Sequence, residues 1–179
     1  MNKIFEELLF SNEQIVARCK ELGQEITKDY DGKLPLVVGM LKGSVPFMAE
    51  LIKHIDCDME TEYMQCSSYE GTESTHNVVV KKDLSASIEG RHVLVVEDIV
   101  DTGLTLKLVM GLLKDRKPAS LEIVSLLNKP ARRIVEGLEV KYIGFEVENK
   151  FVVGFGLDYD GLYRNIEEIG VLKKEIYMK

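Results

Sequence analysis

The 179-residue chain has no tryptophan, few cysteines and histidines, and no long hydrophobic run. Its longest apolar stretches reach only about half of the roughly 18 residues that a membrane span needs. The first ten residues, MNKIFEELLF, carry acids where a signal peptide is basic, and no small-residue cleavage site is present. We therefore expect no membrane segment and no export, which indicates a cytoplasmic protein.

The scarce cysteines and histidines also argue against two kinds of stabilising site. The cysteines are odd in number and show no C-x-x-C spacing, which indicates reduced thiols and not a disulfide framework. The histidines are far apart in the sequence, with no cysteine doublet nearby, so no zinc site is expected. These residues are Cys19, Cys57, Cys66, His54, His76 and His92.

Positive charge is also in short supply. The formal net charge is −7, and no cluster of five or more basic residues occurs. Nucleic acid is therefore not expected as the main ligand, because phosphate neutralisation needs a basic face. A small polyphosphate needs only a few local cations and a metal, so it stays possible. With 45% hydrophobic and 30% charged residues, the chain is typical of one globular domain over residues 1–179.

Periodicity predicts alternating strands and helices. Ser11 and Gln14 form a capping box ahead of a helix over residues 12–30. An apolar run from Leu34 to Leu41 predicts a buried strand, and Pro46 starts a helix that runs to about residue 55. Further strands are expected over 57–67, 78–82, 92–100, 121–127, 140–147 and 151–155, with a helix over 102–116.

This alternation favours an α/β fold with a mostly parallel central sheet flanked by helices. Ligands of such sheets bind beyond the carboxyl ends of the strands. The polar stretch 68–77 is long for a hairpin loop, and loops of this length are often functional.

Three acids, a glycine and two threonines meet where the strand 92–100 is followed by a helix. In order they are Glu97, Asp98, Asp101, Thr102, Gly103 and Thr105. Backbone N–H groups at a helix N-terminus, with hydroxyls beside them, form an anion site that suits phosphate. The acids would repel that phosphate, so we expect them to hold sugar hydroxyls or Mg²⁺. A ribose 5-phosphate satisfies this arrangement. A simple helix cap by Asp101 or Thr102 would leave the other two acids unexplained.

The stretch VVEDIVDTGLT, residues 95–105, resembles the phosphoribosyl-pyrophosphate signature of type I phosphoribosyltransferases. From residue 11 to about residue 170 the chain resembles the hypoxanthine-guanine phosphoribosyltransferases of bacterial type. The resemblance implies Mg²⁺-dependent transfer of a phosphoribosyl group from phosphoribosyl pyrophosphate to a 6-oxopurine base, hypoxanthine and guanine. It also implies a small hood over the carboxyl ends of the strands and a homo-oligomer, a dimer or tetramer.

Within the signature, the resemblance implies distinct roles for the residues. Asp101 would be the general base acting at N7 of the purine. Glu97 and Asp98 would hold the ribose hydroxyls or metal. Leu104 lies where a lysine can occur, so the phosphate loop would rely on backbone and hydroxyls.

Two segments before the signature carry further expectations. Lys42 and Gly43 alone indicate a turn with a cation, and the resemblance makes them a pyrophosphate loop with a cis peptide bond before Lys42. Ser68 and Tyr69 alone indicate the start of a mobile surface loop. The resemblance makes them part of a lid that closes over the reacting ribose.

Two segments after the signature complete the expected site. Lys129 alone is typical of a solvated surface lysine, but by resemblance it binds the 6-oxo oxygen of the purine. Phe151 alone indicates a core residue, but by resemblance it stacks on the base, and Val152 meets the base edge through its backbone. Asp158 would lie beside the base and near a second Mg²⁺, and Arg164 would bind pyrophosphate.

Two other functions would explain only part of this sequence. A regulator built on the same fold would need a basic surface or an added DNA-binding region, and the sequence shows neither. A different α/β transferase that uses the acids for a nucleotide ribose would leave Lys129 and the segment 151–164 unexplained.

Overall fold

A computed structural model describes residues 3–69 and 77–178, so residues 70–76 of the expected lid lie outside the described part. The element order is β1 (Phe5–Phe10), α1 (Asn12–Tyr30), β2 (Leu36–Met40), α2 (Val45–Leu51), the 3₁₀ turn η1 (Ile52–His54), β3 (Glu60–Tyr69), β4 (Asn77–Lys82), β5 (His92–Val100), α3 (Leu104–Lys114), β6 (Ser120–Asn128), the 3₁₀ turn η2 (Pro130–Arg132), β7 (Tyr142–Glu146), β8 (Val152–Val153), β9 (Ile169–Leu172) and α4 (Lys174–Tyr177).

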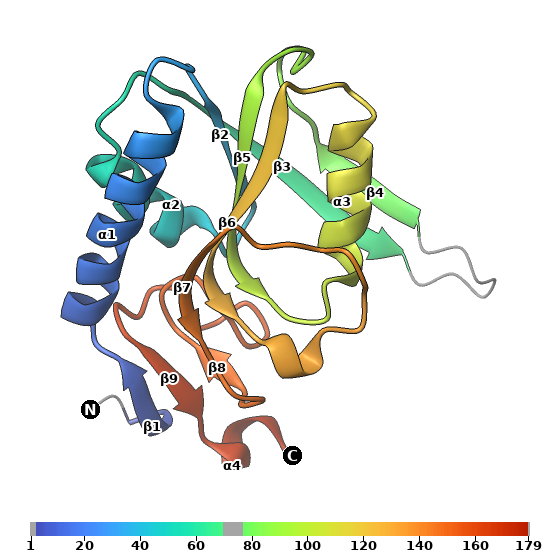
Figure 1. Ribbon diagram of the computed structural model, residues 1–179. Coiled ribbons are helices and arrows are strands. Elements are labelled where there is room, and N and C mark those ends of the chain that lie inside the picture. Colours follow the sequence, from blue (N-terminus) through green and yellow to red (C-terminus); the bar gives the residue numbers. More distant parts are fainter. Residues whose placement is uncertain (1–2, 70–76, 179) are drawn as a thin grey trace.

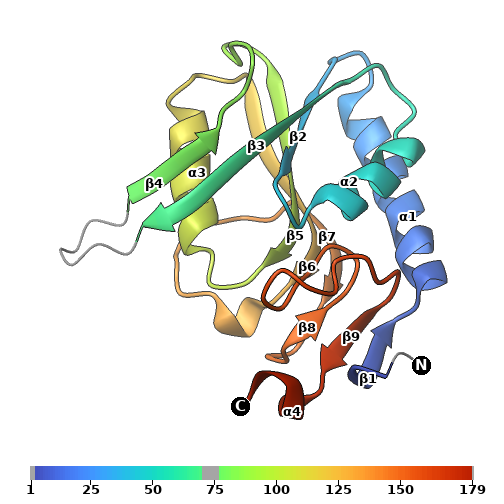
Figure 2. The same cartoon turned by 180° about the vertical axis from the view of Figure 1, so that it is seen from behind.

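The central sheet confirms the predicted α/β architecture. Its strand order is β4-β3-β2-β5-β6-β7, and every neighbouring pair is parallel except β3 and β4. Helices α1 and α2 cover one face of this sheet and α3 covers the other (Figures 1 and 2). The carboxyl ends of the parallel strands therefore meet along one edge, where the site was expected.

Burial on both faces explains why the central strands are continuous apolar runs. Every residue of β2 is buried, and β5 contributes Leu94 and Val96 to one core and Val93 and Val95 to the other. This division follows from the alternation of side chains along a strand. One core includes α1 and α2, and the other includes the buried face of α3.

Local signals set the helix boundaries. The capping box of Ser11 and Gln14 is present at the start of α1, as predicted. The helix that begins beside Pro46 ends at Leu51 and continues as the turn η1, which is close to the expected end near residue 55. None of the described helices combines the length and apolar character needed to cross a membrane.

A second, antiparallel sheet of order β1-β9-β8 lies beyond the carboxyl ends of the central strands (Figure 1). It is the expected hood, but the edge strand β1 and the central strand β9 were not predicted. Phe5 pairs with Leu172, so the sheet joins the two ends of the chain. The strand expected over 151–155 is limited to Val152–Val153, because Gly154 and Phe155 have φ values of 100° and 48°.

Candidate active site

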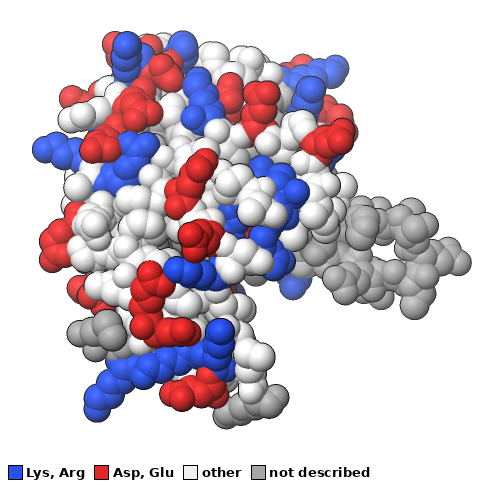
Figure 3. Space-filling model, turned by 60° about the horizontal axis from the view of Figure 1, so that its bottom comes forward, with Lys and Arg blue, Asp and Glu red and all other residues white. Residues whose placement is uncertain are grey.

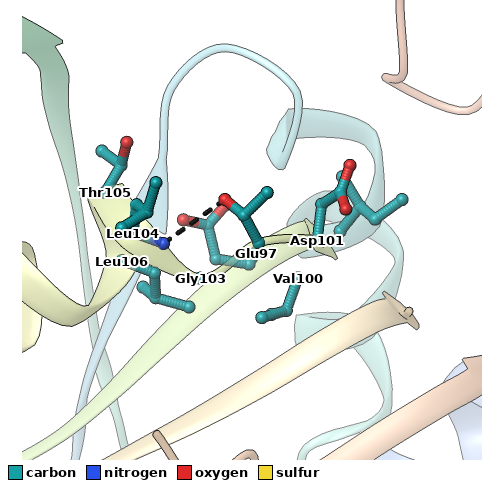
Figure 4. A pocket seen from close by; sticks show the side chains of 9 residues that line it. Glu97, Val100, Asp101, Gly103, Leu104, Thr105 and Leu106 are labelled. Carbon is teal, nitrogen blue, oxygen red and sulfur yellow. Dashed lines mark hydrogen bonds between the residues drawn. The ribbon is translucent and has the colours of Figure 1, made fainter. Parts of the chain in front are cut away.

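The phosphate loop predicted at residues 101–105 lines a cavity of about 160 Å³ at the N-terminus of α3. Gly103 precedes the helix with φ 81°, a value that glycine adopts readily. Gly103 is also the N-cap residue of α3, and it makes no side-chain hydrogen bond to the first turn of the helix. Leu104 and Thr105 of the first turn line the cavity, and the Leu104 N–H donates to Thr102 Oγ1 at 3.5 Å (Figure 4). This arrangement suits an anion.

A larger cavity of about 460 Å³ adjoins the first one, and the two share Ile99 and Asp101. Its lining comes from the end of β5, from Lys129 and η2 after β6, from β8 and the residues on either side of it, and from α4. The residues are Asp98, Ile99, Asp101, Lys129, Arg132, Asn149, Lys150, Phe151, Val152, Leu157, Asp158 and Tyr177. The structure therefore brings Lys129, Phe151, Val152 and Asp158 together, as the resemblance implies. Its volume falls within the roughly 300–1,000 Å³ of small-molecule sites.

The acids Glu97 and Asp98 lie near the carboxyl end of β5, within the strand and not in the loop after it. Neighbours in a strand point to opposite faces. Glu97 lines the first cavity and Asp98 the second. Burial raises the pKa of Asp98 to about 6, and burial together with the Asp98 charge raises the pKa of Glu97 well above its ordinary value. A bound cation or hydroxyl donors would therefore stabilise the ionised form of both acids.

Lys129 is buried, with 6% of its surface exposed, which corrects the reading of a solvated lysine. Its Nζ donates a hydrogen bond of 2.7 Å to the carbonyl oxygen of Lys150. Burial lowers the pKa of the Lys129 ammonium, and the nearby Asp101 opposes that shift. A lysine held in this way presents its other donors to the cavity.

Asp101 is held at its main chain and contacted at its carboxylate by two arginines that sequence reasoning missed. Arg132 Nε lies 2.7 Å from Asp101 Oδ1, and Arg133 Nε donates to the Asp101 carbonyl oxygen at 3.2 Å. The first contact is an ion pair that buries Oδ1 but does not have hydrogen-bond geometry. The Asp101 side chain as a whole is 38% exposed and lines both cavities, so the carboxylate can still meet a ligand N–H.

The loop after β2 packs directly against Asp98. The peptide bond between Leu41 and Lys42 is cis, as the resemblance implies. A Cβ atom built on Gly43 would lie 1.7 Å from Oδ2 of Asp98, and one built on Gly156 would lie 2.0 Å from the Gly43 carbonyl oxygen. Only glycine allows this close approach. Lys42 itself is exposed.

Arg164 and Asp158 form an ion pair near this loop. Arg164 Nη2 lies 2.7 Å from Asp158 Oδ1, and Arg164 Nη1 donates to the Gly156 carbonyl oxygen at 2.6 Å. The other oxygen, Asp158 Oδ2, accepts a hydrogen bond of 2.8 Å from the Gly161 N–H. Asp158 is therefore committed to protein partners. Within residues 3–69 and 77–178, no three His, Cys, Asp or Glu side chains converge to hold a metal ion.

The expected lid is only partly described. Ser68 and Tyr69 end β3, and their backbones pair with Val78 and Asn77 of β4. Their side chains lie outside the described part, so their predicted role stays a prediction. On the face shown in Figure 3, basic and acidic side chains are interspersed, without one large field of either sign.

Comparisons with known proteins agree with this geometry. Residues 7–160 match the family described as phosphoribosyl transferase domain. The chain is 53% identical over 180 residues to a hypoxanthine-guanine phosphoribosyltransferase of Lactococcus lactis subsp. lactis, covering 100% of this chain and 97% of that protein. A crystal structure of a hypoxanthine phosphoribosyltransferase from Staphylococcus aureus is 52% identical, with a TM-score of 0.93 and coverage of 97% and 94%. The hypoxanthine phosphoribosyltransferase from Trypanosoma cruzi in complex with the product IMP is 39% identical, with a TM-score of 0.93 and 99% of each chain covered.

Proposed function

The chain belongs to the phosphoribosyl transferase domain family, and we propose that it is the hypoxanthine-guanine phosphoribosyltransferase of a purine salvage route. It transfers the 5-phosphoribosyl group from phosphoribosyl pyrophosphate to hypoxanthine and yields IMP and pyrophosphate. We extend the proposal to guanine, which would give GMP. The observation that carries it is the pair of adjoining cavities, one at a helix N-terminus and one lined by Lys129 and Phe151, which share Asp101.

In the reaction, N9 of the purine attacks C1 of the ribose while the bond from C1 to the pyrophosphate oxygen breaks. The proton on N7 passes to the carboxylate of Asp101, which lines both cavities. The helix N-terminus of α3 would hold the 5-phosphate and so fix the position of C1. Lys42 and Arg164 would stabilise the negative charge that grows on pyrophosphate.

Base selection follows from the chemistry of Lys129. An ammonium donates hydrogen bonds and accepts none, so it suits the 6-oxo oxygen of hypoxanthine or guanine. The 6-amino group of adenine would bring donor against donor and leave a buried charge unpaired. Phe151, which is 41% exposed, offers an aromatic surface to the base.

The residues present fit Mg²⁺ as the metal. Glu97 and Asp98 are carboxyls whose pKa values are raised mainly by burial, which a cation would offset. Mg²⁺ commonly binds one or two carboxylates and takes its other oxygens from substrate phosphates and water. When bound, it would neutralise charge on the pyrophosphate. Chelation should abolish turnover, and Mg²⁺ or Mn²⁺ should restore it without zinc; full activity in exhaustively chelated buffer would contradict the proposal.

The decisive experiment measures pyrophosphate release with hypoxanthine, guanine, xanthine and adenine offered in parallel, each with phosphoribosyl pyrophosphate. We expect turnover with hypoxanthine and guanine and none with adenine. Absence of release with every base would overturn the proposed function. Efficient release with adenine would overturn the 6-oxopurine assignment and leave the phosphoribosyl transfer intact.

A further inference from the structure

Three aromatic side chains gather at the second cavity and form what we call the aromatic cluster: Phe151, Tyr159 and Tyr177. The Phe151 and Tyr177 rings stack with centroids 4.9 Å apart and an interplanar angle of 19°. Tyr159 meets Phe151 edge to face, with centroids 5.7 Å apart and an angle of 82°. Such pairs are favourable geometries for aromatic rings. Phe151 and Tyr177 both line the cavity that we assign to the base.

Tyr177 reaches this position because the C-terminal turn α4 is fixed to the small sheet. The Lys173 N–H donates to the Ile4 carbonyl oxygen at 3.0 Å, and the Leu172 N–H donates to the Phe151 carbonyl oxygen at 2.9 Å. Ile176 and Tyr177 pack against the small core formed by Phe5, Val153 and Leu172. The Tyr177 ring is therefore held by the sheet and does not depend on a ligand for its place.

Tyr177 covers one face of the Phe151 ring, and 41% of the Phe151 residue stays exposed. Tyr177 and Tyr159 together therefore leave a large part of Phe151 uncovered. The cavity keeps about 460 Å³ with Tyr177 in place, so Tyr177 does not fill the space for a base. Tyr177 thus supports one face of the Phe151 ring and leaves space in the cavity for a base.

We propose that Tyr177 is a positioning residue for the base, because it stacks on the back of Phe151 and fixes the ring against which the 6-oxopurine packs. This inference rests on the proposed function. It assigns part of the base site to the last turn of the chain, far in sequence from the phosphate loop. The stack should matter for ligands that carry a base and not for ligands that lack one.

The test compares the affinities of IMP and phosphoribosyl pyrophosphate by calorimetry. Tyr177→Ala should weaken IMP binding by about 2- to 10-fold, the range that corresponds to one lost aromatic pair. The KM for hypoxanthine should rise by a similar factor, with kcat and the affinity for phosphoribosyl pyrophosphate little changed. Tyr177→Phe keeps the ring, so its IMP affinity and its KM for hypoxanthine should match those of the wild type.

Met178→Ala is the matched control, because Met178 is the next residue, is 68% exposed and lies outside the aromatic cluster. Tyr177→Leu is a second variant that keeps apolar volume without a ring, in case the alanine variant folds poorly. It should show the same selective loss of IMP affinity.

Unchanged IMP affinity in Tyr177→Leu and Tyr177→Ala would overturn the inference, and so would equal losses for both ligands. Tighter IMP binding in these variants would also overturn it, since Tyr177 would then compete with the base. A wild-type protein that fails to bind IMP at all would instead refute the proposed function.

Discussion

Replacing Lys129 by glutamine tests how this site chooses its base. The Lys129 ammonium has three donors, and one of them is used by the Lys150 carbonyl oxygen at 2.7 Å. Two donors are left for the 6-oxo group. A hydrogen bond to a charged group contributes about 1.5–3 kcal/mol, which corresponds to about 10- to 150-fold in kcat/KM. We expect Lys129→Gln to lower kcat/KM for hypoxanthine within that range.

The same substitution should narrow the gap between hypoxanthine and adenine. An amide both donates and accepts, so its oxygen can receive a hydrogen bond from the 6-amino group. Sites built on one polar contact can discriminate by roughly 10⁴-fold, and the variant should lose much of that ratio. The assay is kcat/KM for hypoxanthine, guanine and adenine with wild type and variant at saturating phosphoribosyl pyrophosphate.

Lys114→Gln is the control for this experiment, because Lys114 is an exposed lysine in the last turn of α3. It should leave all three values unchanged. If Lys129→Gln lowers the values for hypoxanthine and adenine by the same factor, Lys129 does not contact the 6-position and the reasoning fails.

Three more predictions follow from the acids and the glycine beside them. Asp101→Asn should fold and bind phosphoribosyl pyrophosphate normally but lose about 10²- to 10⁴-fold in kcat; a variant that keeps half of its kcat would remove Asp101 from the mechanism. Gly43→Ala should lose most of its activity, because the added Cβ would lie 1.7 Å from Asp98 Oδ2, whereas Gly111→Ala, with no atom within 4 Å, should be fully active. Burial raises the pKa of Asp98 from 3.8 to about 6, so its contribution to stability is present below the unfolded value and is lost as pH rises through about 6. The Tm of the ligand-free protein should fall across that window, and Asp98→Asn should show a smaller fall.

Much of the central sheet could be predicted because its signals are local. A parallel strand buried on both faces is a continuous apolar run, and the runs at β2 and β5 are bounded by clear turns. The small sheet has no such signal. β8 has two residues, and β1 pairs with β9 across almost the whole chain, so its stability depends on contacts that no local window contains. Phe5 is buried because Val153 and Leu172, which are distant in the sequence, pack against it.

The same division applies to the candidate site. Residues 97–105 are consecutive, so their chemistry can be interpreted from the sequence, and the cavities place them where ligands of parallel sheets bind. Arg132 and Tyr177 were missed because each acts through a partner that is distant along the chain. The adjacent arginines at 132 and 133, soon after Lys129 at the carboxyl edge, were a signal that could have been used.

The phosphate loop is itself shaped by that later segment. The Ile134 N–H donates to the Thr102 carbonyl oxygen at 3.2 Å, and Arg133 Nη2 donates to Asn128 Oδ1 at 2.6 Å while its Nε binds Asp101. A Cβ on Gly103 would lie 2.7 Å from the Val135 side chain, so the segment also limits the loop sterically. Arg133 therefore ties Asn128, the last residue of β6 and the neighbour of Lys129, to the loop that follows β5. The hydrogen bonds of Arg133, together with the sheet, set the distance between Lys129 and the phosphate loop. The loop sequence alone therefore does not define the site.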